Sequence, residues 1–236
     1  MQLEPIRTND SGAGSVVLGR PISSEAQKVL RNTYLLLALT MVPTIGGALV
    51  GMTTGGIILQ HPIISTLVML AAVVGLQFAI VANRNSVIGV ALLLLMTGLL
   101  GWWIGPMLNY ALALKNGAQL VGYAAGGTGL VLFAMATVAT VTKRDFSFMG
   151  KFLFVGMIAL LIAMLANMFL QIPALGLALS TIAIVIFSLF LLHDLSRIVT
   201  GGETNYIVAT TGVYISLLNV FVNLLNLLMA LTGERD

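Results

Sequence analysis

The sequence predicts an all-α integral membrane protein, a bundle of seven transmembrane helices. Of its 236 residues, 58% are hydrophobic and only 8% are charged, whereas soluble domains carry roughly 25% charged residues. Between Arg31 and Glu234 only nine side chains bear a formal charge, and each lies at a boundary between long apolar segments. A helix needs roughly 20 mostly apolar residues to cross the hydrocarbon core. Seven segments meet that requirement.

The predicted spans follow one another through short connections. In order they cover residues 33–54, 62–82, 86–108, 118–142, 150–170, 174–192 and 207–232. The connections are residues 55–61, 83–85, 109–117, 143–149, 171–173 and 193–206. None of them is long enough to hold a second folded domain, so we expect one membrane domain over residues 25–236.

The first 24 residues differ from the rest of the chain. They are polar, contain Gly12, Gly14, Gly19 and Pro21, and lack the early apolar core of a secretory signal peptide. We therefore expect residues 1–24 to form a flexible N-terminal tail that buries no core, and the first span to be retained. Residues 24–32 are expected to begin an interfacial turn that leads into this span.

The distribution of Lys and Arg predicts the orientation, because positively charged loops stay in the cytoplasm. A cytoplasmic N-terminus places nine basic residues inside: Arg7, Arg20, Lys28, Arg31, Arg84, Lys143, Arg144, Lys151 and Arg197. Only Lys115 and Arg235 then lie outside. The prediction is a cytoplasmic N-terminus and an external C-terminus.

The composition argues against several functional classes. Without cysteine the chain has no disulfide, thiolate metal site or thiol nucleophile, and its basic residues form no block with interleaved aromatic residues of the kind that binds nucleic acid. No nucleophile–base pair, phosphate-binding glycine loop or metal-ligand spacing is present. We therefore expect that the protein is not an enzyme, needs no cofactor and has no metal site of this kind. The expected partners are the lipid bilayer and an ion or a protein that interacts with the polar residues.

Asp194 is the one acid that is expected at membrane depth, near the cytoplasmic end of the sixth span. An ionisable residue there is a candidate functional site, because partial desolvation penalises its charged form and makes it a candidate proton-sensitive switch. Arg197, three residues further on the same helical face, would oppose this effect by stabilising the carboxylate. The alternative is an Asp–Arg pair that only anchors the helix end. His193 titrates near neutral pH when unperturbed and is a further candidate for pH sensing.

The last span carries a narrow polar stripe. Gly212, Ser216, Asn219, Asn223 and Asn226 are spaced by 4, 3, 4 and 3 residues and share one helix face. Such a face avoids lipid, so the stripe predicts that the last helix lies at the centre of the bundle. Its side chains either bond neighbouring helices or line a hydrated path.

Glycines recur four residues apart within three predicted spans. These pairs are Gly47 and Gly51 (followed by Gly55), Gly101 and Gly105, and Gly122 and Gly126. Small residues at this spacing let helices approach closely in lipid. We expect all three sets to form contacts within the bundle rather than between copies of the chain.

Several segments together resemble the Bax inhibitor family of transmembrane proteins, in its bacterial YccA-type branch. They are residues 143–148 (KRDFSF), 193–198 (HDLSRI), 202–207 (GETNYI) and the last helix from Asn219 to Leu228. The likeness covers the chain from about Ala26 onward. It implies seven helices in the bacterial inner membrane with the last helix central.

The resemblance also implies two alternative functions. Family members that leak calcium in a pH-dependent manner share a proton between two aspartates on the last two spans. Asp194 matches the first, but Ser216 occupies the second position, so the paired carboxylate site is broken here. The basic latch of the family corresponds to the region of Arg84.

The YccA-type branch implies a modulator of the membrane quality-control protease FtsH, which it engages through a cytoplasmic N-terminal tail. Loss of the second carboxylate favours this non-enzymatic regulatory role. The alternative is a pH-sensitive calcium or cation leak gated around Asp194, Arg197, Ser216 and Asn219. The polar stripe discriminates between them, because a leak requires a continuous wet path beside it.

Overall fold

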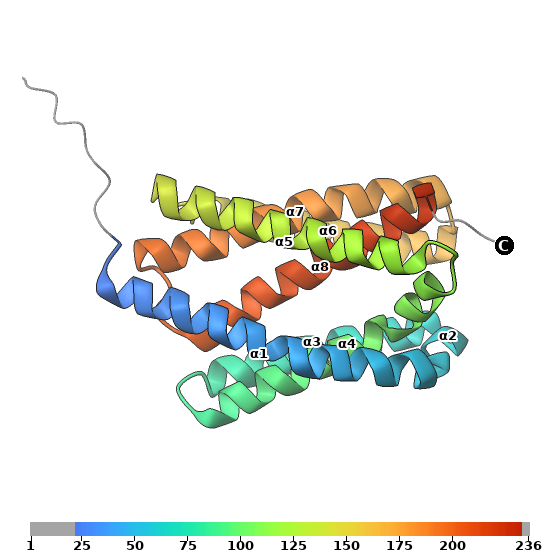
Figure 1. The fold of residues 1–236 in the computed structure, drawn as a ribbon, viewed down its shortest axis with the longest axis horizontal. Helices are drawn as coiled ribbons and strands as arrows, with labels where there is room; N and C mark the ends of the chain where they lie inside the picture. The colour runs from blue at the N-terminus through green and yellow to red at the C-terminus, as the bar shows by residue number, and fades with distance from the viewer. Residues whose placement is uncertain (1–21, 233–236) are drawn as a thin grey trace, which may run out of the picture.

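A computed structural model describes residues 22–232, and this part of the chain is helical throughout, without strands. The helices are α1 (Ser24–Thr54), α2 (Gly56–Gln60), α3 (Pro62–Ala82), α4 (Val87–Leu112), α5 (Gly117–Thr142), α6 (Met149–Leu170), α7 (Pro173–Thr200) and α8 (Tyr206–Thr232) (Figure 1). All of them except α2 are long and apolar enough to cross a membrane. The predicted fold class is therefore confirmed.

The seven long helices match the predicted spans, but α1 and α7 extend further. Helix α1 begins at Ser24 instead of residue 33, because the Ser23 hydroxyl accepts a hydrogen bond from the Ala26 amide and caps the helix. Helix α7 continues from residue 192 to Thr200 and ends where Gly201 adopts a φ of 82°. Two predictions are therefore wrong: the turn over residues 24–32 and the start of a connection at His193. In both places the apolar segment ends at polar residues, but the helix continues through them.

The helices form two groups on either side of α8. Helices α1 to α4 pack on one side and α5 to α7 on the other, while α8 runs diagonally between them (Figure 1). Helix α8 packs directly against α1, α3, α4, α5 and α7. The last helix is therefore central, as its polar stripe predicts.

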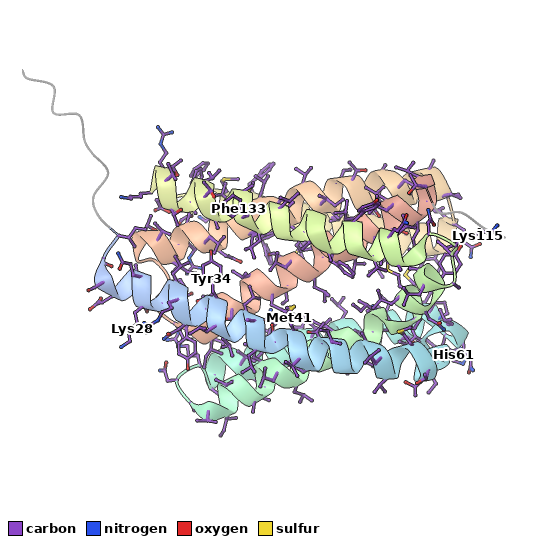
Figure 2. The ribbon with its side chains drawn as sticks, viewed as in Figure 1. Lys28, Tyr34, Met41, His61, Lys115 and Phe133 are labelled. Atoms are coloured by element: carbon purple, nitrogen blue, oxygen red, sulfur yellow. The ribbon has the colours of Figure 1, made fainter. Side chains whose placement is uncertain are left out.

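The connections alternate between the two ends of the bundle. The start of α1 and the connections over residues 83–86, 143–148 and 201–205 lie at one end, which the charge distribution assigns to the cytoplasm and which we call the predicted cytoplasmic end. Lys28 lies there, whereas His61 and Lys115 lie at the opposite end (Figure 2). Large apolar side chains such as Phe133, Phe152 and Phe78 point outward and are about three-quarters exposed, as expected for faces that contact lipid.

Helices α1 and α4 approach each other along a line of glycines. A Cβ atom at Gly47, Gly51 or Gly101 would clash with the main-chain carbonyl oxygen of Gly98, Trp102 or Thr44, respectively. Glycine at these positions thus permits backbone contact between the helices. The expected bundle contacts are confirmed for this pair. They are wrong for Gly122 and Gly126, where a Cβ atom would meet no atom of the described residues within 4 Å.

This difference between glycines gives a stability prediction. Gly101→Ala should lower the free energy of unfolding by about 1–3 kcal/mol, because the new methyl group forces apart two backbones in contact. Gly126→Ala is the matched control and should leave stability unchanged or raise it slightly, since alanine is the better helix former. Denaturant titration of the two variants in mild detergent measures this. Equal stability of both variants would contradict the assigned packing.

Candidate functional site

The last turns of α7, beyond residue 192, place the candidate site inside the bundle. The Asp194 side chain points toward α8, where a Cβ atom at Gly212 would lie only 2.5 Å from the carboxylate Oδ2. Asp194 therefore faces the central helix, and Gly212 provides the space for its carboxylate. A cavity of about 170 Å³ adjoins this contact, lined by Gln77, Asp194, Arg197, Glu203, Val208, Ala209 and Gly212.

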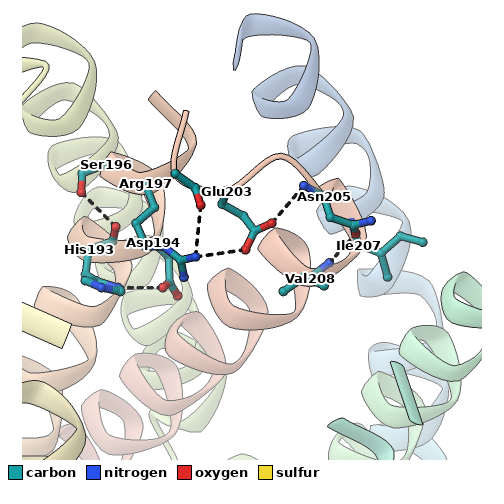
Figure 3. A network of polar contacts seen from close by, with 9 residues as sticks. His193, Asp194, Ser196, Arg197, Glu203, Asn205, Ile207 and Val208 are labelled. Atoms are coloured by element: carbon teal, nitrogen blue, oxygen red, sulfur yellow. Dashed lines mark hydrogen bonds and ion pairs between the residues drawn. The ribbon is translucent and has the colours of Figure 1, made fainter. Parts of the chain in front are cut away.

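His193 is the bonding partner of Asp194. Its Nδ1 lies 3.0 Å from Asp194 Oδ1, and the two side chains are 12% and 20% exposed (Figure 3). The other edge of the imidazole lies against α6, since a Cβ atom at Gly150 would approach Nε2 to 2.8 Å. The pair therefore connects α6, α7 and α8.

Arg197 bonds a different acid from the one the sequence indicates. Its guanidinium donates to Glu203 Oε2 at 3.4 Å and to the Gly202 carbonyl at 3.3 Å (Figure 3). The predicted stabilisation of Asp194 by Arg197 is therefore replaced by an Arg197–Glu203 pair. The reason is that the chain turns back after Gly201, and the Glu203 amide donates to the Arg197 carbonyl at 3.0 Å.

Asn205 ties this network to the connection between α3 and α4. Its Oδ1 accepts from the amides of Ile207 and Val208 at 3.0 and 3.1 Å, which caps the start of α8. Its Nδ2 donates to the Arg84 carbonyl at 2.8 Å and to Asn85 Oδ1 at 2.9 Å.

Arg84 therefore joins the site through its main chain. Its side chain is exposed, and Arg84 does not line the cavity beside Asp194. The region that the resemblance identifies as a basic latch is held here by an asparagine amide.

The polar stripe of α8 makes contacts within and between helices. Asn219 and Asn223 donate to the carbonyls of Ile215 and Asn219, one turn back on α8, at 2.9 and 2.8 Å. Asn226 donates to the Ser180 hydroxyl of α7 at 2.9 Å. Ser216 is buried, at 3% exposed. The residues lining the Asp194 cavity reach Gly212 on α8 and do not include these four.

The connection between α5 and α6 lies on the same end of α7. The Phe146 amide donates to the Ser196 hydroxyl at 3.4 Å. Within this connection, which lies outside the spans, hydrogen bonds from Ser147 hold the pKa of the Asp145 carboxyl below its usual value, and the charges of His193 and Arg197 act in the same direction. The contribution of this carboxylate to stability is present above its usual titration range and is lost as the pH falls through the lowered value.

Sequence reasoning missed several residues that build the site. Gln77 is an isolated polar residue on an apolar span, and the packing of α3 beside α8 brings it to the cavity that Asp194 also lines. Glu203 and Asn205 belong to a recognised motif but carried no predicted role. Tyr214 is buried and its hydroxyl bonds Thr44 Oγ1 of α1 at 2.8 Å. A buried tyrosine within a span is the signal that points to such a contact, because its hydroxyl requires a partner.

Fold and site define a multi-pass helical membrane protein with a carboxylate held against its central helix. Comparison with known proteins identifies the family: the model for the inhibitor of apoptosis-promoting Bax1 matches residues 26–233. The chain belongs to the Bax inhibitor family, as its motifs indicate.

The chain is also similar to individual bacterial proteins over most of its length. It is 42% identical over 201 residues to the modulator of FtsH protease YccA of Escherichia coli strain K12, covering 85% of this chain and 89% of that protein. The inner membrane protein YccA of E. coli O6:H1 shows the same values. A membrane protein of Vibrio cholerae serotype O1 is 41% identical over 204 residues, covering 86% of this chain and 90% of its own.

The residues of the site offer few ligands to a metal ion. Within residues 22–232 there is no group of three or more His, Asp or Glu side chains that could hold one. Ca²⁺ takes about six to eight oxygen ligands. The two acids at the cavity are Asp194 and Glu203, and each already bonds a nitrogen group of His193 or Arg197.

The contact between Asp194 and Gly212 can be tested by a double-mutant cycle. Gly212→Ala should lower the free energy of unfolding by about 1–3 kcal/mol, because the methyl group collides with the carboxylate. In an Asp194→Ala background the same change should cost no more than about 0.5 kcal/mol, since the colliding atoms are gone. Additive effects in the two backgrounds, measured by denaturant titration in detergent, would mean that the side chains do not touch.

Proposed function

We propose that this chain is a non-enzymatic regulator in the bacterial inner membrane that modulates the quality-control protease FtsH. The observation that carries the proposal is the 42% identity with the E. coli modulator of FtsH protease YccA, which spans 85% of the chain. The relative's description as an inner membrane protein supports the location.

The use of the polar side chains supports a role in interaction rather than conduction. The amide nitrogens of Asn219, Asn223 and Asn226 all donate to protein acceptors. A helix that bonds its polar groups in this way needs no water beside it. Of these three bonds, the one from Asn226 crosses to α7 and holds α8 within the bundle, whereas Asn219 and Asn223 bond carbonyls of α8 itself.

The N-terminal segment is the candidate contact with the protease. Residues 1–21 lie outside the described residues, and the family match begins at residue 26. The segment is continuous with α1, whose first turn is fixed by the Ser23 cap. A protease at the cytoplasmic face would reach this segment if the predicted orientation holds.

A second candidate function is the proton-dependent cation leak, which the cavity beside Asp194 favours. This cavity gives the carboxylate a polar surrounding at the predicted cytoplasmic end. Ser216, which stands at the position that the resemblance assigns to the second aspartate of the family, is buried and does not line this cavity. The leak therefore ranks second.

Removal of the N-terminal segment tests the first proposal. Deletion of residues 2–20 leaves the Ser23 cap intact and should sharply reduce co-purification with FtsH, because the contact segment is lost while the bundle is retained. The control replaces these residues by a Gly/Ser linker of equal length, which should fail in the same way. Unchanged recovery of FtsH with both variants would refute engagement through this segment.

Calcium flux into dye-loaded liposomes between about pH 5 and 8, the range of carboxylate and histidine titration, tests the second candidate. The wild type should show weak or no flux, because it lacks the second carboxylate. Ser216→Asp should gain flux, and Asp194→Asn serves as the control without either acid. A robust wild-type flux that Asp194→Asn abolishes would reverse the order of the two candidates.

A further inference from the structure

The connection between α5 and α6 carries an exposed basic surface at the predicted cytoplasmic end. Arg144 follows the end of α5, Lys151 lies in the first turn of α6, and both residues are exposed. Within residues 22–232 neither side chain forms a hydrogen bond or an ion pair. Two positive charges therefore face the surroundings of the protein without a bonded acid from the described part of the chain.

The acid of this connection does not cancel these charges. Residues 143–151 contain three Lys and Arg side chains and a single acid, Asp145, which leaves a net charge of +2. The Asp145 carboxylate accepts a hydrogen bond from the Ser147 amide at 2.8 Å, and the charges that act on it are those of His193 and Arg197 on α7. The surface therefore attracts anions.

Apolar side chains surround Lys151 on the outward face of α6. Phe148, Phe152 and Val155 are between 67% and 78% exposed, and their spacing places them with Lys151 on one helix face. In a bilayer such side chains lie among lipid acyl chains. The long stem of Lys151 can lie along this face while its ammonium group stays at the level of the headgroups.

The start of α6 adds a partial positive charge at the same place. Phe148 precedes this helix and offers no side-chain cap, so no acceptor side chain neutralises the positive pole of the helix dipole. A ligand that matches all of these features joins a negatively charged head to apolar chains, as an anionic phospholipid does. A zwitterionic phospholipid also carries a cationic group, which Arg144 and Lys151 repel.

We propose that the surface formed by Arg144, Phe148, Lys151, Phe152 and Val155 binds an anionic phospholipid. The two basic side chains bind its phosphate, and its acyl chains lie against the apolar residues of α6. Because Arg144 and Lys151 belong to opposite ends of the connection, the lipid joins the end of α5 to the start of α6. Helix α6 packs mainly against α7, and the lipid gives it a second attachment. This inference does not depend on FtsH or on ion flux.

The start of α1 offers a matched comparison at the same end of the bundle, on a different side from the end of α5 (Figure 1). Lys28 and Arg31 are exposed there, and Leu35, one turn further along α1, is 64% exposed. This surface differs from that of α6 in two respects. It contains an acid, Glu25, in the first turn, and the Ser23 hydroxyl caps the helix.

The absence of cysteine from the chain permits labels at single sites. Val155→Cys and Leu35→Cys are labelled with bimane in the full-length protein, in bilayers of phosphatidylcholine with a minor share of phosphatidylglycerol. A nitroxide on the upper acyl chain of either lipid quenches the label on contact, so the ratio of the two quenching efficiencies gives the local enrichment of the anionic lipid. We expect an enrichment of at least about fivefold at Val155→Cys, the effect of one basic side chain near an anionic lipid, and clearly less at Leu35→Cys.

Two double variants separate this surface from the general charge of the bundle end. Arg144→Gln with Lys151→Gln should abolish the enrichment at Val155→Cys. Lys28→Gln with Arg31→Gln removes the same charge at the same end and should leave it unchanged, because exposed charges beyond about 8–10 Å are largely screened at physiological salt. Equal enrichment at the two reporters, or an equal response to the two double variants, would overturn the proposal.

Discussion

Polar groups inside a bilayer must be bonded within the protein, because lipid offers them no partner, and this constraint accounts for the position of α8. Helix α8 carries Ser216 and three asparagines along one face, so it is stable only where other helices cover that face. The bonds of Tyr214 to Thr44 of α1 and of Asn226 to Ser180 of α7 then attach the central helix to both groups. Apolar packing alone would discriminate weakly among helix arrangements in lipid, so these bonds define the arrangement.

Close approach between helices depends on the absence of side chains at a few positions. Gly101 lets α1 and α4 meet at the backbone, and Gly212 makes room for a carboxylate between α7 and α8. The two glycines have different roles: Gly101 lets two backbones meet, and Gly212 leaves space for a carboxylate. Gly122 and Gly126 have the same spacing as Gly101 and Gly105 but face no other described residue within 4 Å of a Cβ position. The spacing of small residues therefore indicates a smooth helix surface, and the fold decides whether another helix covers it.

The seven spans and the central last helix were predictable, because apolar length and a polar stripe are properties of single helices. Asp194 was also identifiable, since an acid among apolar residues is conspicuous in any sequence of this kind. Its partner was not predictable. The i to i+3 rule selects Arg197 on a regular helix, but the turn after Gly201 brings Glu203 back to the guanidinium. The cavity that Gln77 and Asp194 both line depends on the packing of helices distant in sequence, which no local pattern encodes.

Each acid at the cavity bonds a nitrogen group, and this distinguishes the site from a pair of carboxylates that share a proton. Two acids close together repel and retain a proton between them, whereas Asp194 bonds His193 and Glu203 bonds Arg197. Each acid then has a nitrogen partner on or beside α7, and Ser216 adds no charge on α8. A divalent cation would have to compete with both partners for the carboxylates. Acids that are bonded within the protein in this way suit a site that holds helices in a defined arrangement.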